Sequence, residues 1–291
     1  MTSHPEVIFV GGTRFSGAEA VAALLATRPG VSAVPSAVRL QTDPWGIPAL
    51  LHGHIGLDDF AERVRVHEIA ELVPRERLDA ALAALRAGYH TDPLQSCRDL
   101  FWALIGEVAG EEGPGTLVEA SPGNLVEAHT LTRLVPRARF VHVIRDGREV
   151  AAAAVESDEV DVGRLAAGLE WWAGELREIQ RGLRGEEDGA RYAIPSEQLA
   201  VVIVDELADS GASAVYRRLL ESLSLREDEP VDDSARAVLH ATAIDRGGWR
   251  TQVRGPGRWW VTRRYERTLD ELAAEGNLAA PALRAAFDRY G

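Results

Sequence analysis

Short apolar runs alternate along the chain with longer stretches in which apolar residues recur every three or four positions. Unbroken apolar runs of four or five residues are typical of strands that are buried on both faces of a parallel sheet. The recurring spacing is typical of helices that bury one face. The pattern therefore predicts an α/β fold, a parallel sheet flanked by helices, with strands at 7–10, 31–34, 116–119, 140–144 and 201–204.

The stretch between the second and third predicted strands is long and mostly helical in its pattern. Residues 41–59 are rich in proline and glycine and predict a loop. Three helices follow, and we assign residues 57–110 to a variable helical insertion. An Arg- and Trp-rich loop and final helices occupy residues 244–291. Because no low-complexity linker or internal repeat divides the chain, we expect a single domain over residues 1–291.

The composition bounds the partners and the compartment. The 291 residues carry a formal charge of −13, which argues against nucleic acid as the main partner. No apolar run approaches the roughly 20 residues of a membrane span, and no signal peptide opens the chain. The single cysteine, Cys97, excludes an intramolecular disulfide framework and a thiolate metal cluster. We therefore expect a cytoplasmic protein that binds neither nucleic acid nor membrane.

All 32 basic residues are arginine, because the sequence contains no lysine. Phosphate chemistry based on lysine is therefore excluded, and so are Schiff bases. Each cationic role falls to arginine, which stays charged and binds phosphate through two N–H groups.

The first apolar run ends in a glycine-rich loop at residues 12–17, which has the glycine spacing of a Walker A motif. Such a motif continues with Lys and Ser or Thr, but Ala18 and Glu19 stand here, which disfavours a P-loop kinase or hydrolase. A strand, a tight turn and a helix N-terminus remain, and their backbone N–H groups attract an anion. We expect Arg14 to supply a cation and Ser16 a hydroxyl donor. The alternative is a turn without a ligand.

A second element follows the strand predicted at 140–144. Arg145 comes directly after this strand, so it lies at the carboxyl edge of the sheet, where ligands bind in such folds. An isolated arginine at this place would more simply form a salt bridge. Together with the loop at 12–17, however, Arg145 indicates a small molecule that carries phosphates at both ends.

Five segments of the chain resemble the PAPS-dependent sulfotransferases, in particular the bacterial members. The string FVHVIRDGREVAAA at 140–153 is similar to their 3′-phosphate-binding motif, and residues 10–31 are similar to their 5′-phosphosulfate loop. TLVEASPGNLVEAHTL at 116–131 and DPWGIPALLHGHIGLDDF at 43–60 are similar to further segments of the bacterial members. Residues 247–250 resemble their C-terminal Gly-Arg-Trp loop.

The resemblance implies a P-loop-like parallel sheet and an activity. It implies transfer of a sulfuryl group from 3′-phosphoadenosine 5′-phosphosulfate (PAPS) to a hydroxyl or amine of a small-molecule acceptor, such as a secondary metabolite. The donor is left as 3′,5′-ADP (PAP), and no metal is expected. The residues that the resemblance places against the donor are Gly12, Thr13, Arg14, Phe15, Ser16, Gly17, Ala18, Arg145, Ala153, Arg246, Gly247, Trp249 and Arg250.

Four positions depart from the family pattern. Phe15 replaces the basic residue before Ser-Gly, and Ala18 stands where a threonine hydroxyl is expected. Ala153 replaces the serine that comes eight residues after Arg145, and Ala37 takes the place of a glutamate base. The alternative to a working sulfotransferase is therefore a diverged homologue that no longer uses PAPS. Such a homologue would be a binding module or an enzyme with another reaction in the same pocket.

Sulfuryl transfer needs a cation near the leaving 5′-phosphate and a base near the acceptor. Arg14 is the candidate cation. Glu119, at the end of a predicted strand, and His129, on the helix that follows, are the candidate bases, and a structural role is the alternative for each. The Arg- and Trp-rich segment around Trp249 and Arg250 has two interpretations. It either holds a planar base and a phosphate or packs as a C-terminal lid.

Overall fold

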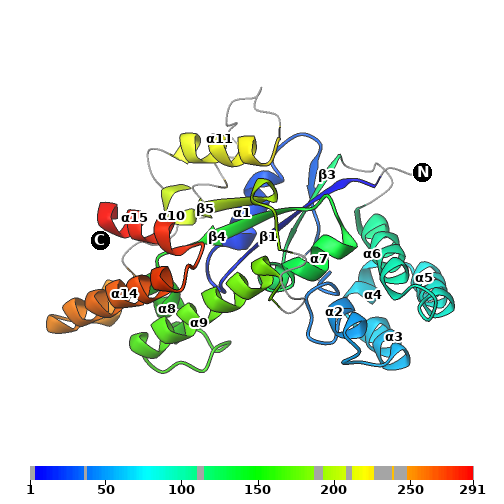
Figure 1. Cartoon of the computed structure of the whole chain (residues 1–291), viewed down its shortest axis with the longest axis horizontal. Helices are drawn as coiled ribbons and strands as arrows, with labels where there is room; N and C mark the ends of the chain where they lie inside the picture. Colours follow the sequence, from blue (N-terminus) through cyan, green and yellow to red (C-terminus); the bar gives the residue numbers. More distant parts are fainter. Residues whose placement is uncertain are drawn as a thin grey trace.

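A parallel sheet forms the centre of the protein (Figure 1). The computed structural model describes residues 4–35, 38–109, 115–186, 193–207, 212–225, 238 and 248–290. Within these residues the sheet has five strands in the order β2-β3-β1-β4-β5, and every neighbouring pair is parallel. The predicted α/β fold is thereby confirmed. The strands are β1 (Glu6–Gly12), β2 (Val31–Ala33), β3 (Thr116–Ala120), β4 (Arg139–Ile144) and β5 (Leu199–Ile203).

Helices cover both faces of the sheet, which is why its strands are mainly apolar. Alternate residues of β1 point to opposite faces. Ile8 and Val10 belong to the core shared with α1 and α11, whereas Val7 and Phe9 belong to the core shared with α6, α7 and the end of α9. These helices are α1 (Ala18–Leu25), α6 (Pro93–Ala109), α7 (Ala128–Leu134), α9 (Leu165–Arg184) and α11 (Ala212–Ser222).

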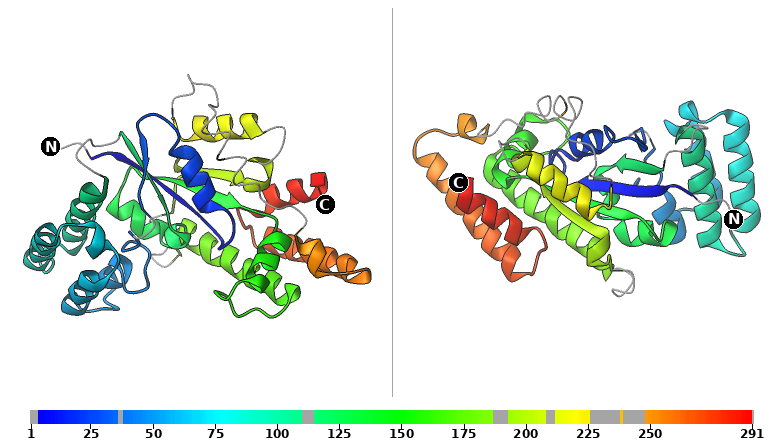
Figure 2. Two further views of the ribbon diagram at one scale, coloured as in Figure 1. Left: turned by 180° about the vertical axis from the view of Figure 1, so that it is seen from behind. Right: turned by 90° about the horizontal axis from the view of Figure 1, so that it is seen from above.

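The helical insertion lies between β2 and β3 in the sequence and at one end of the molecule (Figures 1 and 2). Phe101 of α6 joins it to the sheet, with its ring centroid 6.4 Å from that of Phe9. Besides α6, the described residues of this segment form α2 (Ile47–Leu51), α3 (Leu57–Val66), α4 (Ile69–Leu72) and α5 (Arg75–Gly88).

The loop predicted over residues 41–59 is wrong in part, because α2 lies within it and α3 begins at Leu57. Pro48 lies in the first turn of α2, where a missing backbone N–H breaks no helical hydrogen bond. Ile47 and Leu50 are almost fully buried. Burial of these side chains therefore outweighs the proline and glycine content that predicted a loop.

The C-terminal helices lie at the opposite end of the molecule from the insertion (Figure 2). They pack against the helix after β4 and against α9, through Trp172 and Tyr265 among others. In the described part of the chain, no helix is long and apolar enough to cross a membrane. The elements at this end are α8 (Gly147–Glu156), α13 (Trp249–Gln252), α14 (Pro256–Ala274) and α15 (Ala280–Tyr290).

The close approach of α9 to the segment before α7 gives the first testable prediction. A Cβ added at Gly182 would lie 2.1 Å from the carbonyl oxygen of Val126 and 2.3 Å from that of Leu125. We expect Gly182→Ala to lower the free energy of unfolding by about 2–3 kcal/mol, because backbone must move to admit the methyl group. Urea denaturation measures the change.

Gly174→Ala in the same helix is the matched control, since a Cβ there meets no atom within 4 Å. Its expected effect is a gain of roughly 0.5–1 kcal/mol from the better helix propensity of alanine. Equal stability of the two variants would contradict the packing of α9 described above.

Candidate functional site

The loops that follow β1 and β4 open at the same edge of the sheet. The two strands pair in parallel with Gly12 opposite Val143, so their carboxyl ends lie side by side. β3 flanks β1 on its other side. Ligands of open α/β sheets bind beyond the carboxyl ends of strands where the strand order reverses, and β1 is that place here.

An open cleft of about 930 Å³ lies beyond these strand ends. Its wall is formed by the loop after β1, the start of the segment after β4, the turn after β3 and residues 39 and 42–44 before α2. A volume of this size is typical of small-molecule sites. The predicted donor-binding residues that the structure brings together around it are Gly12, Thr13, Arg14, Phe15, Ser16, Gly17, Ala18, Arg145 and Ala153.

The loop between β1 and α1 is a tight turn that presents backbone to the cleft. Ser16 N donates to the carbonyl oxygen of Thr13 at 3.1 Å, and Gly17 adopts a φ of 88°. A Cβ at Gly12 would lie 2.3 Å from the carbonyl oxygen of Val143, so only glycine fits there. Ser16 Oγ is buried without a hydrogen-bond partner among the described residues, and no side chain caps α1. Unsatisfied donors at this turn suit an anion.

Phe15 links this loop to two other parts of the structure. Its φ of 62° is left-handed, which costs a side-chain-bearing residue about 1–2 kcal/mol. Its ring faces Trp171 of α9 at a centroid distance of 6.2 Å, and its carbonyl oxygen accepts a hydrogen bond of 3.1 Å from Arg145 Nη1. These contacts hold the strained turn. The side chain that replaces the family's basic residue is thus engaged in aromatic packing.

Three guanidinium groups, those of Arg14, Arg39 and Arg145, line the cleft. Arg14 is exposed there, as a group that meets a ligand must be. Arg39 and Asp43 line the same wall, although neither was among the predicted site residues. Asp43 is the first residue of the family-like segment at 43–60 and Arg39 lies before that segment, so no motif singles out either residue.

Glu119 lies beneath the cleft and is only 1% exposed. Its carboxylate accepts hydrogen bonds from Ser121 Oγ at 2.5 Å and from Asn124 Nδ2 at 2.6 Å. Burial raises the pKa of Glu119 to about 7, although these hydrogen bonds act to lower it. Asn124 Nδ2 also donates to the carbonyl oxygen of Val10 at 2.9 Å. The Glu119 side chain therefore braces β3 against β1 and does not line the cleft.

His129 is equally buried, on α7. Its Nε2 lies 3.2 Å from Thr130 Oγ1, and its ring centroid lies 6.0 Å from that of His52. Like Glu119, it does not line the cleft. In the described residues, no group of three or more His, Cys, Asp and Glu side chains is placed to hold a metal ion.

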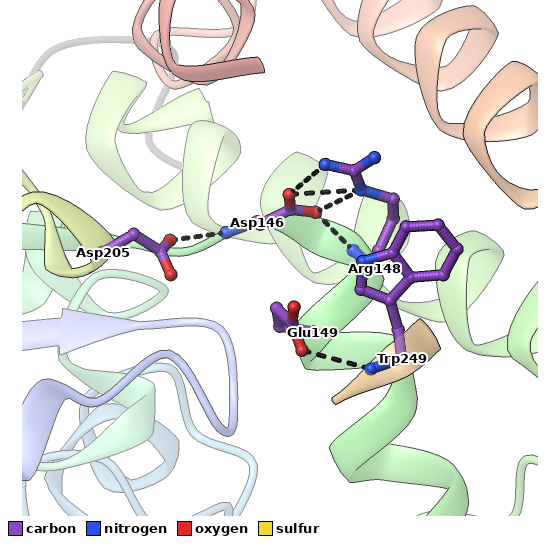
Figure 3. Close-up of polar contacts among 5 residues, drawn as sticks. All are labelled: Asp146, Arg148, Glu149, Asp205 and Trp249. Atoms are coloured by element: carbon purple, nitrogen blue, oxygen red, sulfur yellow. Dashed lines mark hydrogen bonds and ion pairs between the residues drawn. The ribbon is translucent and has the colours of Figure 1, made fainter. Parts of the chain in front are cut away.

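Trp249 and Arg250 line a second, smaller cavity of about 200 Å³, which lies against α8. Trp249 is 2% exposed, and its backbone N–H donates to Glu149 Oε2 at 3.3 Å (Figure 3). The described part of the Arg- and Trp-rich segment thus packs against α8 at Trp249. Arg246, Gly247 and Ala37 lie outside the described residues.

Arg148, in the first turn of α8, joins this segment to the strand end (Figure 3). Its guanidinium is bound by the Asp146 carboxylate, with the shortest contact, from Nη2, at 2.6 Å. The guanidinium carbon also lies within about 5 Å of the ring centroids of Trp249, Tyr265 and Phe287. One buried cation therefore contacts α13, α14 and α15 together.

The comparisons with known proteins agree with this geometry. A model described as the sulfotransferase family matches residues 5–229. The chain belongs to this family. The match to the family model ends before Trp249. The aromatic residues around Arg148 therefore lie outside the matched region. A search of curated proteins finds no match.

Two solved sulfotransferase domains share the fold. The domain from the olefin synthase of Synechococcus PCC 7002 is 18% identical, with a TM-score of 0.50 over 91% of this chain and 95% of that one. The domain from the curacin biosynthetic pathway is 15% identical, with a TM-score of 0.52 over 94% of this chain and 99% of that one. The sulfotransferase fold therefore extends over the C-terminal helices as well.

The contacts of Arg148 predict a stability difference between two ion pairs. Arg148→Met should lower the free energy of unfolding by about 3 kcal/mol, because it leaves the Asp146 carboxylate unpaired in a largely buried place. Urea denaturation measures this, with near-UV circular dichroism to follow the surrounding aromatic rings.

Arg177→Met is the matched control. Arg177 also pairs with a carboxylate, Glu275, and that pair joins α9 to the end of α14, but both side chains are more than 40% exposed. Loss of this exposed ion pair should lower the free energy of unfolding by less than about 1 kcal/mol. A cost as large as that of Arg148→Met would show that burial does not set the strength of the Arg148 contact.

Proposed function

We propose that this sulfotransferase moves a sulfuryl group from PAPS to a hydroxyl or amine of a small-molecule acceptor. The observation that carries the proposal is the cleft beyond β1 and β4, which combines a glycine turn, an uncapped helix N-terminus and Arg145. Ser16 Oγ adds a buried hydroxyl without a partner among the described residues. An oxygen anion at this place would satisfy the hydroxyl and the first backbone N–H groups of α1.

The donor carries phosphate at two places, and the cleft offers two binding elements. We assign the 5′-phosphosulfate to the turn at 12–18 and the 3′-phosphate to Arg145. Because Arg145 Nη1 also holds the carbonyl oxygen of Phe15, the same guanidinium fixes the position of the turn. Ala18 and Ala153 contribute methyl groups to the wall, so arginine and backbone donors carry most of the binding.

PAPS, when bound, supplies an activated sulfuryl group, and negative charge grows on its 5′-phosphate as that group departs. A cation that is already in place stabilises this charge. Arg14 is the cationic residue of the turn itself, and its side chain is exposed in the cleft. We therefore assign it the role that the family's basic residue at position 15 would have.

We place the acceptor on the side of the helical insertion. Pro44 lies in the wall of the cleft and also in that of an adjoining groove of about 690 Å³ formed with α3. We propose an acceptor from secondary metabolism. One structural neighbour is named as a domain of a biosynthetic pathway, which supports this proposal. A cytoplasmic enzyme is part of the same proposal, in keeping with a single, buried cysteine.

Nucleotide binding tests the proposal without any knowledge of the acceptor. Calorimetry should show that the chain binds 3′,5′-ADP more tightly than 5′-AMP, which lacks the 3′-phosphate. Arg145→Ala should weaken 3′,5′-ADP about 10- to 100-fold and remove most of the difference between the two nucleotides, since a charged hydrogen bond contributes roughly 1.5–3 kcal/mol.

Arg139→Ala is the control, because Arg139 stands at the opposite end of the same strand and its partly exposed side chain donates to the carbonyl oxygen of Ser222. The affinity of this variant for both nucleotides should stay within about 2-fold of that of the unaltered chain. Absence of 3′,5′-ADP binding in the unaltered chain would overturn PAPS use and favour a diverged homologue. Saturable ATP binding with hydrolysis would favour a P-loop kinase or hydrolase.

The role of Arg14 predicts an effect on transfer itself. With saturating PAPS and benzyl alcohol as a hydroxyl acceptor, Arg14→Ala should slow formation of 3′,5′-ADP about 100-fold in single turnovers. Arg217→Ala, on the exposed side of α11, should leave the rate unchanged. An unaltered rate in Arg14→Ala would refute the assignment of the cation.

A further inference from the structure

The wall of the cleft holds a carboxylate whose setting differs from that of the other acidic residues there. Glu19 and Glu159 also line the cleft, but both are exposed. The Asp43 side chain is 16% exposed and meets His67, whose Nε2 lies 3.0 Å from Asp43 Oδ2. Asp43 is thus a partly buried acid that still reaches the cleft.

The hydrogen bonds around His67 fix which nitrogen carries its proton. Its Nδ1 accepts from the backbone N–H of Ile69 at 3.3 Å. The neutral ring therefore bears hydrogen on Nε2 and donates it to Asp43 Oδ2. Trp45 packs edge-on against the imidazole at a centroid distance of 5.2 Å. The ring is held, and it orients the carboxylate as in other acid–histidine pairs.

The backbone of Asp43 is fixed as well. Its N–H donates to the carbonyl oxygen of Arg39 at 2.8 Å, and its own carbonyl oxygen accepts from Gly46 N at 2.8 Å. Pro44, the next residue, lines both the cleft and the adjoining groove that we assign to the acceptor. Asp43 therefore stands where a donor in the cleft and an acceptor from the groove would meet.

The surrounding charges act on this carboxylate in both directions. Burial raises the pKa of Asp43, whereas the hydrogen bond from His67 and the nearby Arg39 guanidinium lower it and Glu68 raises it. Arg39 Nε lies 4.0 Å from Oδ1. Burial prevails, so the pKa lies above the ordinary value for aspartate, and the ionised carboxylate is a stronger base.

We propose that Asp43 is the general base that removes the proton from the acceptor and that His67 is its positioning residue. This inference rests on the proposed sulfuryl transfer. A lone pair of the acceptor oxygen or nitrogen forms the new bond to sulfur. The bond from sulfur to the bridging oxygen of the 5′-phosphate breaks, and both electrons stay with that oxygen. The acceptor proton moves to the Asp43 carboxylate.

The assignment also explains why the base was not found among the predicted candidates. The carboxylate of Glu119 and the ring of His129 are buried beside their own partners and do not line the cleft. Asp43 lines it, and its hydrogen-bond partner is a histidine from a different element. In chemical terms it is the acid that combines access with a fixed orientation.

The test compares Asp43→Asn with the unaltered enzyme under saturating PAPS and benzyl alcohol, in single turnovers. The rate of 3′,5′-ADP formation should fall by 100-fold or more. Affinity for 3′,5′-ADP by calorimetry should stay within about 3-fold, since Asp43 is assigned to the acceptor side. The unaltered enzyme should lose activity as pH falls through the raised pKa of Asp43, and Asp43→Asn should lack this acid limb.

His67 is tested by two substitutions. His67→Ala should lower the rate about 10-fold and shift the acid limb, with 3′,5′-ADP affinity unchanged. His67→Gln, whose amide N–H is able to donate to Oδ2, should recover part of the rate. Asp58→Asn is the control for loss of an aspartate between β2 and β3. Asp58 is exposed and paired with Arg86, so this variant should form 3′,5′-ADP at the unaltered rate.

The outcomes separate the two proposals. An unaltered chain that fails to bind 3′,5′-ADP refutes the proposed function and the inference with it. Binding of 3′,5′-ADP by the unaltered chain with no transfer, to benzyl alcohol or to water, refutes the proposed sulfuryl transfer and the base with it. Normal transfer in Asp43→Asn, or an acid limb that persists in it, refutes the base while the proposed function stands. Near-UV circular dichroism confirms that each variant is folded.

Discussion

The parallel pairing of β1 with β4 is the constraint on which the rest of the site depends. Gly12 lies opposite Val143, so the strands end within a few residues of each other and their loops face the same cleft. A shift of the register would separate Arg145 from the carbonyl oxygen of Phe15, to which it now donates. The sheet is covered on both faces by apolar packing, and that packing makes a register shift costly.

The side of the cleft that we assign to phosphate is built from backbone more than from side chains. Gly12 is required by the nearness of the Val143 carbonyl, and the donors of the turn and of α1 do not depend on residue type. Replacement of hydroxyl and basic residues by Phe15, Ala18 and Ala153 therefore leaves the shape of the site intact. Because the chain has no lysine, arginines at neighbouring positions supply the positive charge of the cleft.

Much of the fold was predictable because the strands are mainly apolar and each main helix has a clear apolar period. The loop at 12–18 and Arg145 were predictable as candidates because each directly follows an apolar run, and ligands of parallel sheets bind at the carboxyl ends of the strands. Asp43 was not, since its partner His67 is distant in sequence and belongs to another element. The small cavity at Trp249 was equally hidden, because the aromatic residues around Arg148 come from three separate helices.

The C-terminal end and the helical insertion support different sides of the cleft. Arg148 and Asp146 anchor the C-terminal helices one turn away from Arg145, so the packing at that end supports the strand end that we assign to phosphate. Asp43 and His67 lie in the first part of the segment between β2 and β3. A contact between their side chains sets the orientation of the Asp43 carboxylate. Under the proposed function, donor binding depends on the sheet and its C-terminal brace, whereas proton removal and acceptor choice depend on the insertion. The same proposal implies that a sequence change in the insertion alters the acceptor without disturbing the loops that we assign to phosphate.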